Sequence, residues 1–156
     1  MKKRITSVIL AIVCCLTGIF AWNADAKAQT VSEDIGMENI MTEDALIGYA
    51  TNQSWGVYLL DGSSIINKIS STKVGAGGST NAARSCTVSV TSILERKDSS
   101  GSWVRVTSWT VTNPNSIYAI ISKSVTVPSG SYYRVRSYHN AGTDSATSST
   151  NALLIN

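Results

Sequence analysis

Apolar and polar residues alternate along several stretches between residues 48 and 156. Such alternation is typical of β-strands that bury one face and leave the other in water. The clearest case is Ser85–Arg96, in which the apolar positions of one parity are Cys86, Val88, Val90 and Leu94. Polar residues fill most positions of the other parity. The pattern predicts a strand of an antiparallel sheet, with its apolar side in a core.

Eight such stretches follow one another, and we expect strands at Gly48–Thr51, Gly56–Leu60, Ser64–Ser70, Ser85–Arg96, Trp103–Thr112, Ser116–Val127, Ser131–His139 and Ala152–Ile155. Gly, Pro, Asn and Asp gather between them, as at residues 75–78, 98–101, 113–115, 128–130 and 140–142. Short strands joined by turns, with no helical pattern between them, predict an all-β fold. We expect an antiparallel β-sandwich of immunoglobulin or fibronectin type with about seven to eight strands.

The N-terminus has the order of a secretory signal peptide. Three basic residues at positions 2–4 precede the apolar stretch Ile5–Ala21, and alanines follow at 24, 26 and 28. We expect cleavage after Ala28, so that residues 1–28 are removed and the protein is secreted. The alternative is an uncleaved membrane anchor, because the apolar stretch approaches the length that spans a bilayer. Otherwise we expect membrane contact only during export.

The charge distribution changes once residues 1–28 are set aside. They hold four of the 13 basic and one of the 10 acidic residues, so the remaining chain has nine of each. Residues 29–47 contain five acids and no Lys or Arg, whereas residues 48–156 contain nine basic residues and four acids. We therefore predict an acidic flexible leader (29–47) before a basic β-domain (48–156). The leader either folds back onto the domain or keeps the chain soluble.

The chain beyond residue 28 has few side chains for catalysis. It has one histidine, His139, and one cysteine, Cys86, so neither a histidine-based metal site nor an internal disulfide is expected. No Gly-x-Ser-x-Gly motif is present, and Glu95 and Asp98 flank a predicted turn in the manner of solubilising charges. We predict a non-enzymatic protein with no cofactor and no metal. Its zero net charge gives no reason to expect nucleic acid binding.

The predicted strand Ser131–His139 has two different faces. If Val135 points inward, Tyr133 and Ser137 do so as well, and the outward side chains are Tyr132, Arg134, Arg136 and Tyr138. Tyr rings stack on sugars, and Arg donates planar pairs of hydrogen bonds to carboxylate, phosphate or sulfate. The same residues also suit cross-strand pairing, with Arg stems lying over Tyr rings. His139 completes the candidate set and is expected at the surface or in a turn.

A second candidate patch consists of Trp103, Arg105 and Trp109. The two tryptophans share a parity, whereas Val104 and Val106 have the other. Either a bulge reverses the faces between them, or one face of this strand exposes tryptophan to solvent. An exposed Trp beside Arg105 would form a platform for a carbohydrate.

Three segments resemble an uncharacterised family of small secreted proteins from Gram-positive, clostridia-like bacteria. They are "ARSCTVSVTSILERKDSSGSWVRVTSW", "SKSVTVPSGSYYRVRSYHNAG" and the end of the chain at "NALLIN". The resemblance implies secretion and a single β-sandwich domain. It implies no activity and no catalytic residues.

Together these observations predict a secreted, non-enzymatic binding module. The expected partner is an extracellular glycan or an anionic cell-surface polymer. The alternative is a small antagonistic or signalling protein that acts on a surface protein, with the acidic leader masking the basic domain until it is displaced.

Overall fold

The computed structural model describes residues 31–51 and 56–156. The predicted signal peptide and its cleavage after Ala28 lie outside the described residues. Within them, the elements are β1 (Ser32–Asp34), the 3-10 helix η1 (Met37–Asn39), β2 (Leu46–Tyr49), β3 (Leu59–Ser70), β4 (Lys73–Lys97), β5 (Trp103–Thr126), β6 (Ser131–Ala141), β7 (Asp144–Ser149) and β8 (Leu153–Ile155). None of the helices in these two ranges has the length and apolar character needed to cross a membrane.

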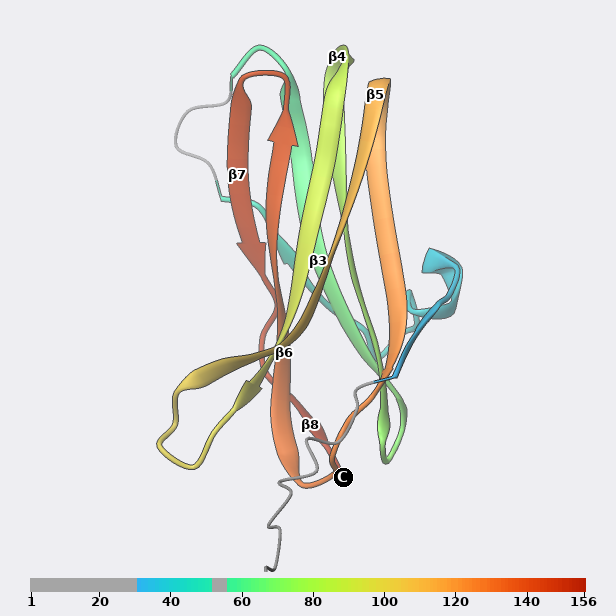
Figure 1. Ribbon diagram of the computed structural model, residues 1–156, viewed down its shortest axis with the longest axis vertical. Helices are drawn as coiled ribbons and strands as arrows, with labels where there is room; N and C mark the ends of the chain where they lie inside the picture. The colour runs from blue at the N-terminus through green and yellow to red at the C-terminus, as the bar shows by residue number, and fades with distance from the viewer. Residues whose placement is uncertain (1–30, 52–55) are drawn as a thin grey trace, which may run out of the picture.

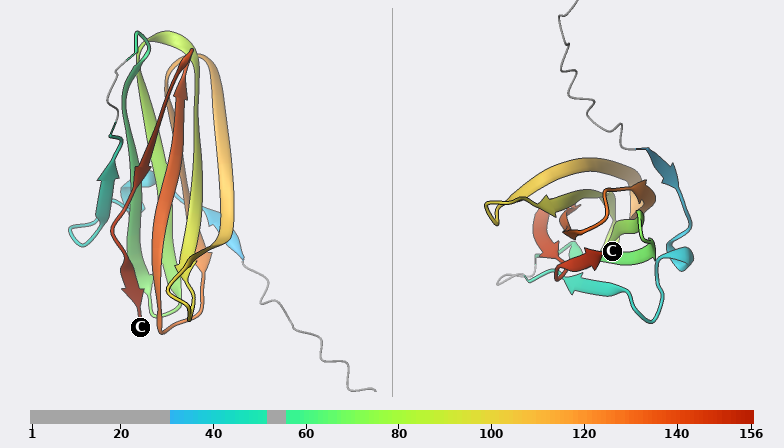
Figure 2. Two further views of the ribbon diagram at one scale, coloured as in Figure 1. Left: turned by 90° about the vertical axis from the view of Figure 1, so that its left-hand side faces the viewer. Right: turned by 90° about the horizontal axis from the view of Figure 1, so that it is seen from below.

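The strands form one antiparallel sheet that folds over on itself. β4 and β5 form a long hairpin, and its register breaks between Asn81 and Cys86. The facing part of β5 contains Asn115, whose φ of 51° lies in the left-handed region. Figures 1 and 2 show both strands running to one end of the molecule and turning back there. The predicted all-β antiparallel fold is confirmed.

The fold-over produces two layers. Layer A contains β1, residues 118–126 of β5, residues 73–82 of β4, β3 and β2, in that order. Layer B contains residues 103–116 of β5, residues 86–97 of β4, β6, and then β7 and β8, which both pair with β6. The end-on view of Figure 2 shows the two layers facing each other.

The core lies between the layers and has three parts. One apolar cluster contains Ile66, Val74, Leu94, Tyr133 and Val135 among others. A second, smaller cluster contains Leu59, Val88, Val90, Ala119 and Ala141 among others. A third group of core residues is polar, and we call it the polar seam: Ser64, Thr80, Ser92, Ser137, His139 and Ser148. Hydrogen bonds join its members across the layers, for example Ser64 Oγ to Ser137 Oγ at 2.8 Å.

The predicted breaks at 75–78 and 113–115 lie inside strands, and one strand was missed. Residues 75–78 were expected to form a turn, but they lie inside β4. Glycine is needed there for space: a Cβ at Gly75 would lie 2.3 Å from Ile40 Cγ2, and one at Gly77 would lie 2.4 Å from a backbone oxygen. β7 was not expected at all, because "DSATSS" is small and polar on both faces.

The acidic segment folds back onto layer A, which is one of the two alternatives that the sequence left open. β1 pairs with β5, and β2 pairs with β3. Glu33 and Asp34 form ion pairs with Lys73 and Lys123. Ile40 is fully buried over Gly75. The segment between the two strands therefore covers one end of the outer side of layer A.

Candidate functional site

The parity predicted for β6 is confirmed. Tyr133, Val135 and Ser137 are fully buried between the layers. Tyr132 and Tyr138 point outward and are 48% and 39% exposed. Burial raises the pKa of Tyr133, whose hydroxyl donates to the carbonyl of Pro128. Tyr132 and Tyr138, together with the arginines of this strand, therefore line an outer surface of layer B.

The two arginines of β6 share one acceptor. Arg134 Nε donates to Glu95 Oε2 at 2.7 Å, and Arg136 Nη2 donates to Glu95 Oε1 at 2.8 Å. Glu95 is only 4% exposed, on β4 between the two flanking strands. It was interpreted from the sequence as a charge that solubilises a turn. That interpretation is wrong, because the register places it beside arginines that are 39 and 41 residues away in the chain.

The same guanidinium groups also lie over aromatic rings. The Arg134 guanidinium lies 4.3 Å from the centre of the Trp103 ring, and that of Arg136 lies 5.4 Å from the Tyr138 ring. Arg136 Nη1 also donates to the Tyr138 hydroxyl at 2.8 Å. We call this outer side of layer B the arginine face: Glu95, Lys97, Trp103, Arg105, Arg134, Arg136 and Tyr138. This arrangement is the cross-strand pairing of Arg and Tyr side chains, which was one of the two alternatives for this strand.

A β-bulge separates the two candidate tryptophans. Leu94 faces Thr107 whereas Glu95 faces Arg105, so β5 contains one extra residue at this point. Trp103 therefore lies on the arginine face, and Trp109 turns inward and packs against the larger apolar cluster. Arg105 remains exposed and donates to Ser108 Oγ. Trp109 does not belong to an outer patch.

His139 lies inside the molecule, which corrects the expectation of a surface residue. It is fully buried, with Nδ1 2.8 Å from Thr80 Oγ1 and Nε2 2.7 Å from Ser148 Oγ. Burial lowers its pKa to about 4, with the charge of Asp61 opposing part of that effect. His139 has the same parity as Val135, so alternation along β6 already indicates an inward side chain, but its partners on β4 and β7 depend on strand register. His139 cannot contact a ligand on the arginine face.

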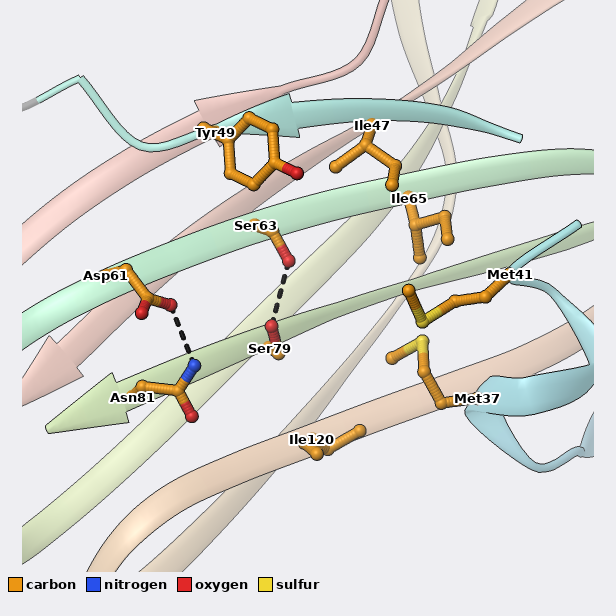
Figure 3. A pocket seen from close by; sticks show the side chains of 10 residues that line it. All are labelled: Met37, Met41, Ile47, Tyr49, Asp61, Ser63, Ile65, Ser79, Asn81 and Ile120. Atoms are coloured by element: carbon orange, nitrogen blue, oxygen red, sulfur yellow. Dashed lines mark hydrogen bonds between the residues drawn. The ribbon is translucent and has the colours of Figure 1, made fainter. Parts of the chain in front are cut away.

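Layer A has an outer surface of another kind. A pocket of about 290 Å³ lies over β2, β3, β4 and β5, with Met37 of η1 and Met41 at one end (Figure 3). We call it the sheet groove, and its lining residues are Met37, Met41, Ile47, Tyr49, Asp61, Ser63, Ile65, Ser79, Asn81 and Ile120. Tyr49 is 70% exposed, and Met41 and Ile120 are also well exposed. A second pocket of about 390 Å³ adjoins it and adds Tyr118, which is 53% exposed.

Two polar pairs form the floor of the sheet groove. Asn81 Nδ2 donates to Asp61 Oδ1 at 2.8 Å, and the hydroxyls of Ser63 and Ser79 lie 2.8 Å apart (Figure 3). Among the residues that the structure describes, Asp61 is the only charged one in the lining. Each pair retains hydrogen-bonding capacity, since a carboxylate and an amide both have more than one polar site. Sequence analysis missed this groove because its residues come from five separate segments.

The described residues offer no evident metal centre. In residues 31–51 and 56–156, no three His, Cys, Asp or Glu side chains lie close enough together to hold an ion.

Comparison with known proteins gives a match to a protein family and to a solved structure. No curated protein matches the chain. Among solved structures, the solution structure of R. palustris CsgH resembles it with a TM-score of 0.33 and 12% identity, covering 66% of this chain and 87% of that one. A likeness this weak supports no functional argument. The model of a family described as "Family of unknown function (DUF6147)" matches residues 29–154, and the chain belongs to that family.

Proposed function

We propose that this protein is a secreted, non-enzymatic module that binds a glycan in the sheet groove. The observation that carries the proposal is that exposed tyrosines and the Asp61–Asn81 hydrogen bond lie on the same open surface. Sugars present an apolar ring face that stacks on an aromatic side chain, and hydroxyls that need fixed donors and acceptors. The groove offers both within one sheet.

The charge of the sheet groove favours an uncharged glycan. Within residues 31–51 and 56–156, Asp61 is its only charged lining residue, and no Lys or Arg of these ranges contributes to it. A carboxylate repels an anionic polymer but accepts hydrogen bonds from neutral hydroxyls. The groove is also open along the sheet, which suits a chain of sugars better than a small enclosed ligand.

The arginine face is a weaker candidate for a neutral glycan. Its aromatic rings already contact guanidinium groups, and Glu95 already accepts from both arginines of β6. A sugar would have to replace these internal contacts before it could stack. We therefore assign the glycan to layer A, although the sequence drew attention to β6.

Secretion is part of this proposal. The signal-like order of residues 2–28 supports export and cleavage after Ala28, and the family match starts at residue 29. The alternative, a signalling or antagonistic protein masked by its leader, finds less support. Glu33 and Asp34 pair with Lys73 and Lys123 on layer A and leave the arginine face uncovered.

Retention of the purified protein on insoluble neutral polysaccharides (cellulose, chitin and xylan) tests the proposal. We expect at least one of them to retain the protein and Tyr49→Ala to weaken that retention about tenfold, because loss of one stacking ring is worth up to about 1.5 kcal/mol. Tyr132→Ala is the matched control, since it removes an exposed tyrosine from layer B. Retention of none of the three, or equal retention of the two variants, would refute the proposal.

A further inference from the structure

The arginine face exposes more positive than negative charge to solvent. Lys97 and Arg105 are exposed, and the side chains of Arg134 and Arg136 are 27% and 39% exposed. The face has one acidic residue, Glu95, whose side chain is only 5% exposed. A molecule approaching from solvent therefore meets four cations, while the single compensating carboxylate lies beneath them.

Glu95 also fixes the geometry of two of these cations. A buried carboxylate is stable only when its lone pairs are well satisfied, and here both oxygens accept from guanidinium groups. Arg134 uses Nε for this bond, so its two Nη groups take no part in it. Trp103 and Tyr138 restrict the planes of the two groups. The arginines are thus preorganised, and little side-chain entropy remains to be lost on binding.

We propose that the arginine face binds an anionic polysaccharide, one that has carboxylate or phosphate groups along its chain. A planar guanidinium group offers paired N–H donors that match the two oxygens of such groups. The four cations are spread over β4, β5 and β6, which favours a polymer with repeated charges over a single small anion. The partner differs from that of the sheet groove, and this site does not depend on that one.

Nucleic acid is the other polyanion to consider, and the structure favours it less. The chain beyond residue 28 has nine basic and nine acidic residues, so it lacks the overall positive charge that draws nucleic acid from a distance. The Trp103 ring, which could stack on a base, is already covered by Arg134.

The test is affinity for polygalacturonate, a uronate polymer, with neutral dextran as the comparison polymer. The double variant Lys97→Gln/Arg105→Gln removes the two cations that Glu95 does not need, so the buried ion pairs stay intact. We expect about tenfold weaker binding from two exposed contacts, and weaker binding of the unmodified protein as salt rises. Arg84→Gln, at the bend of β4, is the matched control and should bind normally.

Three results would overturn this proposal: no binding of polygalacturonate beyond that of dextran, equal affinity of the double variant and the control, or duplex DNA bound as tightly as polygalacturonate. Tyr49→Ala in the sheet groove should leave polygalacturonate binding unchanged. Lys97→Gln/Arg105→Gln should leave retention on neutral polysaccharides unchanged. Failure at one surface is therefore distinguishable from failure at the other.

Discussion

The arginine face and the sheet groove lie on opposite outer sides of the molecule and differ in how their side chains are satisfied. On the arginine face, Glu95 pairs with two arginines and two rings lie beside them. In the sheet groove, Tyr49, Met41 and Ile120 remain well exposed. The first surface thus helps to hold layer B together. The second exposes apolar side chains to water, where they add little to the stability of the fold. Exposed apolar groups gathered in one place are typical of a binding site.

The largest expected effect concerns the polar seam that joins the two layers and so supports both surfaces. His139 has a pKa of about 4 when folded, below its ordinary value of 6.5, because it is buried. As the pH falls below 6.5, His139 therefore takes up a proton in the unfolded chain but not yet in the folded chain. Stability should drop by about 3 kcal/mol between pH 6.5 and 4, and it should be fully retained above that window.

Denaturant unfolding at pH 7, 6, 5 and 4.5 checks this prediction. Carboxylates also titrate near the lower end, so the informative quantity is the difference between the unmodified protein and His139→Gln, which cannot take up that proton. The variant should lose less stability than the unmodified protein as pH falls. Parallel curves would show that His139 does not titrate in this window.

The second prediction compares the acids of the two surfaces. Glu95→Ala should lower the free energy of unfolding by about 2–3 kcal/mol, because two partly buried guanidinium groups lose their acceptor. Asp61→Ala should cost under about 1 kcal/mol, since it removes one hydrogen bond to Asn81 in an open groove. Urea unfolding of both variants gives the two values. Equal losses would mean that the surfaces do not differ as described.

The smallest expected effect is that of Tyr49→Ala on stability. With 70% of Tyr49 already exposed, the change should alter the free energy of unfolding by at most about 0.5 kcal/mol. Thermal unfolding of the purified variant measures this. A loss above 1.5 kcal/mol would show that the tyrosine is a structural residue and not one left free for a ligand.

Local pattern was sufficient to predict some of this structure. The alternation in "YYRVRSY" correctly separated Tyr133 and Val135 from the outward arginines, because side chains of a strand alternate whatever its partners are. The turns at 98–101, 128–130 and 140–142 were also predicted, and Gly101, Gly130 and Gly142 have the positive φ that such turns require.

Other features depend on strand register, which a single sequence does not specify. Glu95 appeared to be a turn residue until β6 placed two arginines beside it. Alternation from Val135 directs His139 inward, but its partner Thr80 is 59 positions away in the chain. Gly75 appeared to mark a turn, although Ile40 of the acidic segment fills the space above it. In each case the decisive neighbour is distant in the chain.

The hairpin of β4 and β5 has a consequence for how this chain folds. Because the hairpin contributes two strands to each layer, a slip of one residue between β4 and β5 would move every β5 side chain to the opposite face in both layers at once. We therefore expect pairing near the turn at 98–101 to form early, because contacts that are local in the chain cost less loop-closure entropy than distant ones. The bulge opposite Leu94 and Glu95 helps to select that register, so a local irregularity constrains the whole folding route.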